Sequence, residues 1–500
     1  MKIFINLALA LACVYMCLGT GRLTYSGGYN ELLKLLLNTL YLYGSVWLFV
    51  KFRYIFWLIF FPFVLFLCFY APVGLTNGMV NEAFVMSIFG TYLSEASEFS
   101  RTLPAEYVLL SIFSLSLIIY LRKTNKTVLT KRQIFIFFTL FAVATATGKL
   151  WGIATTSSFF KSIKFFQKSY NDLKLYQNTV IKPQWQIKSI DNKYQNHVVV
   201  IGESARRDYH EIYGYSIKNN PFLSSVNGTF IDGFNAVGIN TIPSLNGTLN
   251  HNRNLNLNIV DLANLSGFET FWFSNQGYLG CYDTLTTLVA KRAKNVYFMP
   301  KEGGGKFDSD LVGHFAKIFD TPSQKPRVIF LHFIGSHPIT CNKLSSKEYL
   351  KYPDEATFKI NCYVESIRQT DNDLKSVYEI LTRNLQENNE SFSMIYFSDH
   401  GLTHVKKPVE LLAVEHIAKE HLQVPLLKIS SDDNGRKFIQ NESYQSHFPQ
   451  SFAKWIGVQT ENFNEISDVF EEVKQDDFLN SKMLIKNISG DPAIDISSFK

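Results

Sequence analysis

Two short apolar runs in this 500-residue chain end in side chains that can bind a metal ion. The run that begins at Val198 is followed by Glu203, and the run that begins at Met394 is followed by Asp399 and His400. β-Branched residues in runs of this length favour buried strands. In an open α/β sheet, functional groups collect just past the carboxyl ends of strands. The two carboxylates and the imidazole suit a divalent metal such as zinc, although an Asp-His pair alone is more often a cap or a surface turn.

A candidate nucleophile lies between these two runs. Thr241 is followed by Ile, Pro and Ser244, in a loop that leads into an expected helix. Metal coordination lowers the pKa of a hydroxyl, and a helix N-terminus favours an anionic ligand. The sequence therefore predicts that Thr241 is a nucleophile held against the metal. The alternative is that Thr241 or Ser244 is simply an N-cap.

Several histidines follow the expected strands. His337 comes after the apolar run at 327–333, where it can reach a substrate at the same sheet edge. Three more follow His400, namely His404, His416 and His421. We expect one of these three to complete a second metal site or to contact the substrate; the residues alone leave the choice open.

The elements that must position these side chains make up the second half of the chain. Candidate strands are 197–201, 270–274, 327–333, 393–397 and 424–429, and apolar residues recur at helical spacing from Ile367 to Leu381. Strands alternating with helices predict a mostly parallel sheet covered by helices on both faces. We expect this domain to span residues 197–500.

The first half is apolar enough to span a membrane several times. Five segments approach the ~20 residues needed to cross a bilayer: 3–18, 32–49, 55–70, 107–121 and 134–150. The first could be a signal peptide, but four more segments follow it. Basic clusters lie after the second and fourth segments, so the positive-inside rule places both in the cytoplasm. Residues 1–152 are therefore expected to form a five-helix transmembrane domain, with everything after it outside the cytoplasm.

Two further segments have the composition of membrane-surface helices. Residues 79–99, inside the outer loop 71–106, mix apolar and polar residues at helical spacing, including Thr91 and Glu95. Residues 153–196 interleave aromatic and basic residues, which predicts an interfacial linker. The bland alternatives are a solvated loop for the first and a helix packed on the following domain for the second.

Charge and cysteine content give no support for a nucleic-acid-binding protein or for a cysteine-ligated zinc site. The net charge of +6 is modest for this length and gives no reason to expect nucleic-acid binding, whereas it fits an anionic membrane surface. The six cysteines show no CxxC pair or zinc-type spacing.

With these motifs in place, the chain resembles the phosphoethanolamine transferases of Gram-negative inner membranes, which modify lipid A or lipooligosaccharide and include the colistin-resistance enzymes. They belong to the sulfatase and alkaline-phosphatase superfamily. The resemblance covers essentially the whole chain and rests on the motifs Gly-Glu-Ser-Ala-Arg at 202–206, Thr-x-x-Ser at 241–244, Asn-Gln at 275–276, Gly-Ser-His at 335–337 and Ser-Asp-His-Gly at 398–401. It implies five spans followed by a periplasmic sulfatase-like α/β domain.

The resemblance also assigns roles to residues. It implies that the catalytic zinc is bound by Glu203, Thr241, Asp399 and His400, with Thr241 as nucleophile and His337 over the phosphate. Substrate contacts are then expected from residues that match the family's other motifs, namely Thr91, Glu95, Asn275 and Gln276, and from His337. His404 and His416 are further candidates, although the spacing from His400 to the later histidines departs from the family's and leaves the choice among them and His421 open. The chain departs from the family in lacking cysteine pairs around Thr241, and Tyr92 stands where Asn is common.

The function implied by this resemblance is transfer of phosphoethanolamine from phosphatidylethanolamine to lipopolysaccharide or lipooligosaccharide, on lipid A or the core, through a phospho-threonine intermediate. A monomer in the inner membrane with its catalytic domain in the periplasm is expected, and polymyxin resistance would follow if lipid A is the acceptor. In the oxidising periplasm, Cys341 and Cys362 can form a disulfide.

Alternatives of the same superfamily are a phosphoglycerol transferase and a lipid phosphatase. A non-catalytic membrane sensor or scaffold is the alternative of a different class. A sulfatase is disfavoured because its nucleophile is made from Cys or Ser, whereas this chain has Thr241.

Overall fold

The computed structural model divides the chain into two units, Met1–Asn171 and Asp172–Lys500. The boundary between them lies inside the expected linker at 153–196. The residues that the structure describes are 2–21, 29–77, 103–124, 130, 132, 134, 135, 139, 150–178, 182–276, 285–299, 307–320, 323–338, 340–345, 358–405, 411–413, 418–463, 468–471 and 488–497.

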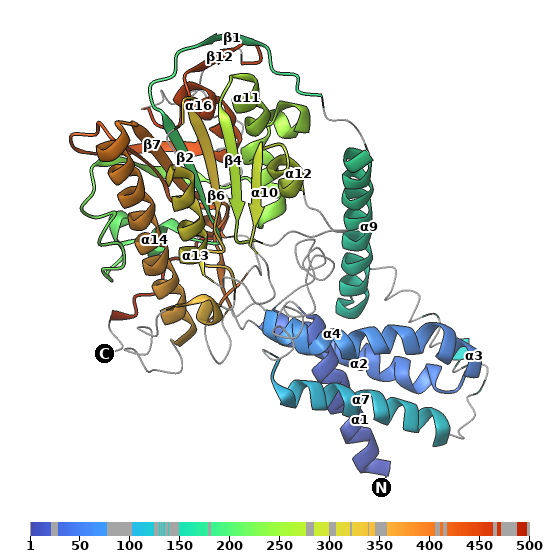
Figure 1. Ribbon diagram of the computed structural model, residues 1–500. Helices are drawn as coiled ribbons and strands as arrows, with labels where there is room; N and C mark the ends of the chain where they lie inside the picture. Colours follow the sequence, from blue (N-terminus) through green and yellow to red (C-terminus); the bar gives the residue numbers. More distant parts are fainter. Residues whose placement is uncertain are drawn as a thin grey trace. The chain divides into compact units, whose positions relative to one another are not determined.

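The first unit consists of helices, most of them long and apolar, and the last of them, α9, is more polar and runs seven residues past the boundary at Asn171 (Figure 1). They are α1 (Lys2–Thr20), α2 (Tyr29–Phe49), a third helix built from α3 (Arg53–Ile55), the π-helical turn η1 (Phe56–Phe60) and α4 (Phe61–Asn77), then α7 (Ala105–Thr124) and α9 (Trp151–Asn178). Among the described residues, four of these helices are long and apolar enough to cross a membrane. The first four expected spans are thereby confirmed as candidate spans, whereas the fifth, at 134–150, lies almost wholly outside the described residues.

Polar groups inside this unit bond to one another. The Tyr15 hydroxyl donates to the Tyr107 carbonyl oxygen at 2.7 Å, and Ser111 donates to the Cys68 carbonyl oxygen at 2.6 Å. A lipid environment offers no water to such groups, so they must be satisfied within the protein. Where α1 crosses α4, a Cβ on Gly19 would lie 2.5 Å from Ala71 Cα, so only glycine permits this close approach.

The second unit is built on an eight-stranded sheet of order β11-β3-β10-β7-β2-β6-β4-β5. Only β10 is antiparallel to its two neighbours, so the other seven strands point the same way. The strands are β2 (Asn196–Gly202), β3 (Gly228–Asn235), β4 (Glu269–Ser274), β5 (Asn295–Phe298), β6 (Arg327–His332), β7 (Phe392–Ser398), β10 (Leu426–Ser430) and β11 (Arg436–Tyr444). A mostly parallel sheet was expected and is confirmed; β10 is the exception.

Alternate residues of the central strands pack against helices on opposite faces, as a two-residue period requires. Val199 and Ile201 face one core cluster, together with residues of α10 (Thr241–Leu249), α11 (Ile259–Leu265), α12 (Leu285–Ala290) and α16 (Phe448–Trp455). Val198 and Val200 face the other, together with residues of α13 (Asp308–Ala316) and α14 (Phe358–Asn388). Figure 1 shows these helices on the two sides of the sheet, which explains why both strand faces are apolar.

Small elements complete this unit. They are the paired strands β1 (Ile187–Ile190) and β12 (Val458–Thr460), the paired strands β8 (Thr403–Val405) and β9 (Leu411–Ala413), helix α15 (Lys419–Leu422), and the short turns η2 (Arg207–Tyr209), η3 (Glu211–Tyr213), η4 (His251–Arg253), η5 (Leu255–Leu257), η7 (Lys317–Asp320), η8 (Thr340–Lys343) and η10 (Gln445–His447).

The five expected strands correspond to β2, β4, β6, β7 and β10. The last begins at Leu426, two residues later than expected, because Pro425 precedes it and cannot donate a ladder hydrogen bond. Strands β3, β5 and β11 were not expected. The helical spacing from Ile367 to Leu381 is confirmed, since both residues lie on the buried face of α14.

Candidate active site

The candidate metal ligands follow two neighbouring strands that end side by side. β2 and β7 are parallel, and Gly202 pairs with Ser398 at their carboxyl ends. Glu203 and Asp399 are therefore the next residues on adjacent strands, and the Asp399 N–H donates to the Gly202 carbonyl oxygen at 3.1 Å. Their proximity is a consequence of strand register.

Glu203 is the most heavily contacted of these ligands, and its carboxylate is buried. Oε1 accepts a hydrogen bond from the Ser204 hydroxyl at 2.6 Å and lies 3.3 Å from His400 Nε2. Oε2 accepts from Thr241 Oγ1 at 3.0 Å and from Gln276 Nε2 at 2.8 Å. Glu203 thus connects the expected nucleophile with the expected metal ligands.

His400 has its ring fixed in the orientation of a metal ligand. Nδ1 lies 2.7 Å from the Gly401 carbonyl oxygen, which can only accept, so Nδ1 carries the proton. Nε2 is the nitrogen left to face a metal ion, and it lies 3.4 Å from Asp399 Oδ2 and 3.5 Å from Thr241 Oγ1. A backbone oxygen that fixes the imidazole tautomer in this way is usual for metal-binding histidines.

The charges in this group are strongly coupled. Burial would raise the pKa of Glu203, but the hydrogen bond and positive charge of His400 hold it well below its usual range. Burial and the Glu203 charge together raise the pKa of Asp399 to about 8. Burial would lower the pKa of His400, but the charges of Asp399 and Glu203 raise it to about 9. Two buried carboxylates that compete for one positive charge mark a position that favours a cation.

The residues present fit a divalent metal. Ligand atoms of Glu203, Asp399 and His400 all lie within 4.8 Å of one another, and all three side chains are buried. Asp399 Oδ1 accepts from the backbone N–H groups of Ser204 and His400, whereas Oδ2 is buried without a hydrogen-bond partner in the described part of the chain. A buried carboxylate oxygen with no donor is costly unless an ion binds it. Two carboxylates and one imidazole suit zinc.

Thr241 is the first residue of α10, and Asn240 is its N-cap. The Thr241 hydroxyl donates to Glu203 and is partly exposed. Ser244 lies inside the helix, where its buried hydroxyl shares its single proton between the Asp399 carbonyl oxygen and the side-chain oxygen of Gln445. The alternative that one of these two residues is merely an N-cap is therefore wrong.

The loop after β6 brings His337 to the same edge of the sheet. The Ser336 N–H donates to the Glu203 carbonyl oxygen at 2.9 Å, and His337 is the next residue, partly exposed. The loop approaches closely because Gly335 has a φ of 45° and no side chain. A Cβ there would lie 2.9 Å from the Glu203 nitrogen.

The Asn-Gln pair after β4 has two different roles in this loop arrangement. Gln276 Nε2 donates both to Glu203 and to the Phe333 carbonyl oxygen. Asn275 instead donates to Asp308 at 2.8 Å, and Asp308 accepts the backbone N–H groups of Ile334 and Gly335. Asn275 therefore supports the His337 loop indirectly, through Asp308. Contact of Asn275 or Gln276 with substrate stays a prediction.

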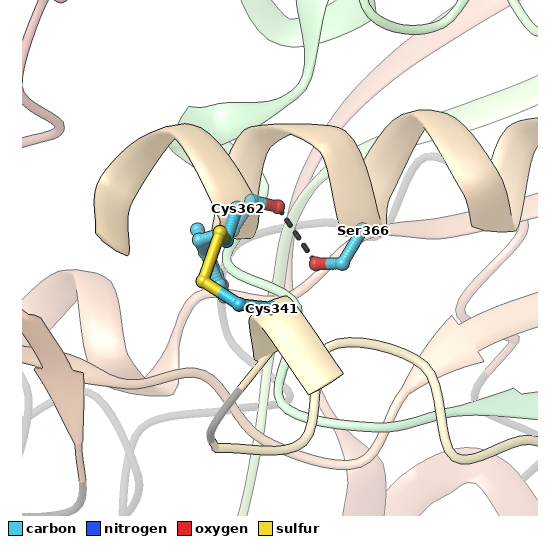
Figure 2. The surroundings of a disulfide bond; sticks show 4 residues. Cys341, Cys362 and Ser366 are labelled. Atoms are coloured by element: carbon cyan, nitrogen blue, oxygen red, sulfur yellow. Dashed lines mark hydrogen bonds between the residues drawn. A yellow bond between two sulfur atoms is a disulfide. The ribbon is translucent and has the colours of Figure 1, made fainter. Parts of the chain in front are cut away.

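A disulfide joins Cys341 to Cys362, as expected from the compartment. Figure 2 shows it between the short helix η8 and α14, with Ser366 one turn further along α14. The Ser366 hydroxyl donates to Ser336 at 2.8 Å, and Tyr363, next to the disulfide, donates to the Ser204 carbonyl oxygen at 2.7 Å. The start of α14 thus holds both the His337 loop and the turn that follows Glu203.

The remaining predicted contacts lie elsewhere. His404 is buried, with Nδ1 2.9 Å from Asp491 Oδ1 and Nε2 2.6 Å from the Tyr209 hydroxyl. His421 Nε2 lies 3.0 Å from the Ile239 carbonyl oxygen, and its ring centroid is 6.1 Å from that of His400. Thr91, Glu95 and His416, and the expected outer-loop helix at 79–99, lie outside the described residues. Roles for these histidines in substrate binding stay predictions.

Sequence reasoning missed two groups that support the site. Arg206 is buried, forms a two-point ion pair with Asp208, and donates to Asp491 in the C-terminal segment 488–497. Gln445 is buried beside Ser244. The Arg206 signal was present in the Gly-Glu-Ser-Ala-Arg motif, since an arginine so close to a buried strand needs acidic partners. Gln445 follows a strand that was not expected, so the sequence offered no signal for it.

Comparison with known proteins gives consistent matches. The family model described as Sulfatase matches residues 195–458. Phosphoethanolamine transferase OpgE of Escherichia coli is 32% identical over 423 residues, which cover 79% of each chain. Two solved structures are similar in fold. The first is the integral membrane lipooligosaccharide phosphoethanolamine transferase A (EptA) of Neisseria meningitidis, with a TM-score of 0.62 and 15% identity; the match covers 93% of this chain and 97% of that chain. The second is the C-terminal periplasmic domain of EptC of Escherichia coli in complex with zinc, with a TM-score of 0.50 and 19% identity; the match covers 58% of this chain and 90% of that chain.

Proposed function

Because the chain belongs to the sulfatase family and, within it, to the inner-membrane phosphoethanolamine transferases, we propose that it transfers phosphoethanolamine from phosphatidylethanolamine to lipooligosaccharide through a phospho-Thr241 intermediate. The protein is a multi-pass inner-membrane protein whose sulfatase-like domain lies in the periplasm. The observation that carries the proposal is the Thr241 hydroxyl at the start of α10, 3.0 Å from Glu203 and beside Asp399 and His400.

Glu203, Asp399, His400 and Thr241 would hold the metal, which we propose to be zinc. The zinc complex of the EptC domain supports this identity, as does the set of two carboxylates and one imidazole. When bound, zinc lowers the pKa of a coordinated hydroxyl and withdraws charge from a phosphoryl oxygen. The remaining chemistry falls to the side chains of the protein.

In the first half-reaction, Thr241 attacks the phosphorus of phosphatidylethanolamine. Its hydroxyl donates to Glu203 Oε2, so a lone pair of Oγ1 is directed away from the carboxylate. A bond forms between Oγ1 and phosphorus, the bond from phosphorus to the diacylglycerol oxygen breaks, and diacylglycerol leaves with the proton that Thr241 gives up. His337, partly exposed in the loop that bonds to Glu203, is the group we assign to carry this proton.

In the second half-reaction, an acceptor oxygen attacks the same phosphorus. The bond to Thr241 Oγ1 breaks and Thr241 regains a proton, which comes from the acceptor hydroxyl or from a protonated acceptor phosphate. The product is a phosphodiester when a hydroxyl is the acceptor and a diphosphate when a phosphate is. The kinetics should therefore be ping-pong. We propose lipid A or the core of lipooligosaccharide as acceptor, and polymyxin resistance would follow only from modification of lipid A phosphates.

The experiment is mass spectrometry of lipooligosaccharide from cells that express the wild-type chain or Thr241→Ala. The wild type should add phosphoethanolamine and Thr241→Ala should add none. Thr248→Ala is the matched control, because Thr248 lies two turns along the same helix and its hydroxyl bonds only to the Ser244 carbonyl oxygen among the described residues. Full transfer by Thr241→Ala would refute the nucleophile assignment. A phosphoglycerol adduct would refute the headgroup, and a modified periplasmic glucan with unmodified lipooligosaccharide would refute the acceptor.

A further inference from the structure

Gln445 is a buried amide whose hydrogen-bonding capacity is fully used. Its side-chain oxygen accepts from the Val237 N–H at 3.2 Å and from the Ser244 hydroxyl. Its side-chain nitrogen donates to the Ser398 carbonyl oxygen at 3.0 Å and to the Asp399 carbonyl oxygen at 2.7 Å. An amide offers two donors and an acceptor with two lone pairs, so none is left over.

The two sides of this amide contact the two halves of the candidate active site. Val237 and Ser244 flank Thr241, one in the loop before α10 and one in its first turn. Ser398 and Asp399 form the end of β7, where the metal ligands begin. A single side chain therefore connects the element that carries the nucleophile with the strand end that carries Asp399 and His400.

Sheet topology brings Gln445 to this position. β11 is parallel to β3, and Tyr444 pairs with Asn235 at the ends of both strands. β10, antiparallel to β3 and to β7, restores the direction, so β11 ends at the same edge as β7. Gln445 is the first residue past that end, the location where functional groups collect in such sheets.

We propose that Gln445 is a positioning residue, which sets the distance of Thr241 from the metal ligands without touching the substrate. The inference rests on the proposed function, because it assumes that Thr241 is the nucleophile. Its physical basis is that reacting groups misplaced by about 1 Å can lose ~100-fold in rate. A residue bonded to the main chain on both sides is suited to prevent such displacement.

Two substitutions separate the amide from its volume. Gln445→Glu keeps the shape but loses both N–H donors and directs a negative charge at the carbonyl oxygens of Ser398 and Asp399. Gln445→Met keeps a similar volume and removes all four hydrogen bonds. Gln440→Glu is the matched control, because Gln440 lies on the same strand with an exposed side chain.

The full-length protein in detergent is assayed with a fluorescent phosphatidylethanolamine as donor and lipooligosaccharide as acceptor, at a temperature well below each variant's unfolding midpoint. We expect both Gln445 variants to lower kcat by ~100-fold, with KM for the lipid unchanged and Gln440→Glu like wild type. Zinc affinity, measured by titration, should change by less than the ~10–100-fold typical when a partner of a ligand side chain is lost, because Gln445 bonds only to main chain at Asp399.

A merely structural role would lower the unfolding midpoint but leave kcat per folded, zinc-loaded molecule unchanged, and that result would overturn the inference. If Thr241→Ala retains activity, the proposed function fails instead, so the two failures are distinguishable. If either Gln445 variant does not fold, Ser244→Ala is used instead, because it removes one of the four contacts of Gln445. A wild-type kcat in the folded, zinc-loaded Ser244→Ala variant would contradict the proposal. A reduced kcat with unchanged KM and zinc affinity would support it.

Discussion

Replacing Gly335 with alanine tests how closely the His337 loop must approach Glu203, the candidate metal ligand. Gly335 has a φ of 45°, in the left-handed region where a residue with a Cβ costs about 1–2 kcal/mol. The new Cβ would lie 2.9 Å from the Glu203 nitrogen and 3.0 Å from its carbonyl oxygen. Both are main-chain atoms and cannot rotate away, so further backbone strain of about 1–3 kcal/mol follows.

The sum is a destabilisation of about 2–5 kcal/mol, which at ~2 °C per kcal/mol lowers the unfolding midpoint by about 4–10 °C. Catalysis should suffer as well, because displacement of the loop breaks the bond from the Ser336 N–H to Glu203 and shifts the carboxylate that orients Thr241. We expect kcat for phosphatidylethanolamine to fall at least ~10-fold.

The assay is differential scanning fluorimetry of the full-length protein in detergent, paired with the lipid turnover assay. Gly313→Ala is the matched control, because Gly313 lies in α13 and a Cβ there meets nothing within 4 Å. Alanine in a helix should stabilise this position by about 0.5–1 kcal/mol. If Gly335→Ala raises the midpoint as Gly313→Ala does, the argument from backbone approach is refuted.

Two further predictions concern the supports of the site. Replacing Cys341 and Cys362 with serine opens a loop with a sequence separation of 21 and should lower the free energy of unfolding by about 3 kcal/mol. Chemical denaturation of the wild type and of the double variant, each without reductant, measures this difference. Equal denaturation midpoints for the two proteins would contradict it. Asp491 has its pKa lowered from 3.8 to about 2, because the hydrogen bonds from His404 outweigh the effect of burial. A depressed folded-state pKa contributes stability above the ordinary pKa, and this stability is lost as the pH falls towards 2. Asp491→Asn should therefore reduce the free energy of unfolding near neutral pH and make it fall less steeply at acid pH. Denaturation measured across this pH range with an unchanged acid dependence would refute the role of Asp491.

The candidate site shows which features short-range patterns reveal. Glu203, Asp399 and His400 could be found because they follow apolar runs that favour buried strands, and two such strand ends in one chain indicate a site more strongly than either does alone. The membrane spans could be found because a bilayer demands ~20 consecutive apolar residues. Each of these signals is contained in one short segment of the chain, so no knowledge of the fold was needed to detect it.

Other features depend on pairings between distant segments. The register of β2 with β7, which brings Glu203 to Asp399, joins residues nearly two hundred positions apart. The sequence does not distinguish His404 from the other histidines that follow His400. In the structure its ring lies 2.9 Å from a carboxylate oxygen of Asp491, 87 positions later. Strand order was required to show that β11 ends at the same edge of the sheet as β7, where Gln445 reaches Ser244 and Asp399.

The division has a physical reason. Local sequence determines which segments bury themselves in lipid or in a sheet, and which polar groups each segment presents at its end. Tertiary structure decides which of those ends meet, because strand order and register are set by the packing of the whole core on both sheet faces. In this chain the local signals supplied the candidate metal ligands and the candidate nucleophile, and only the assembled sheet showed that Gln276, Gln445 and the start of α14 hold them in place.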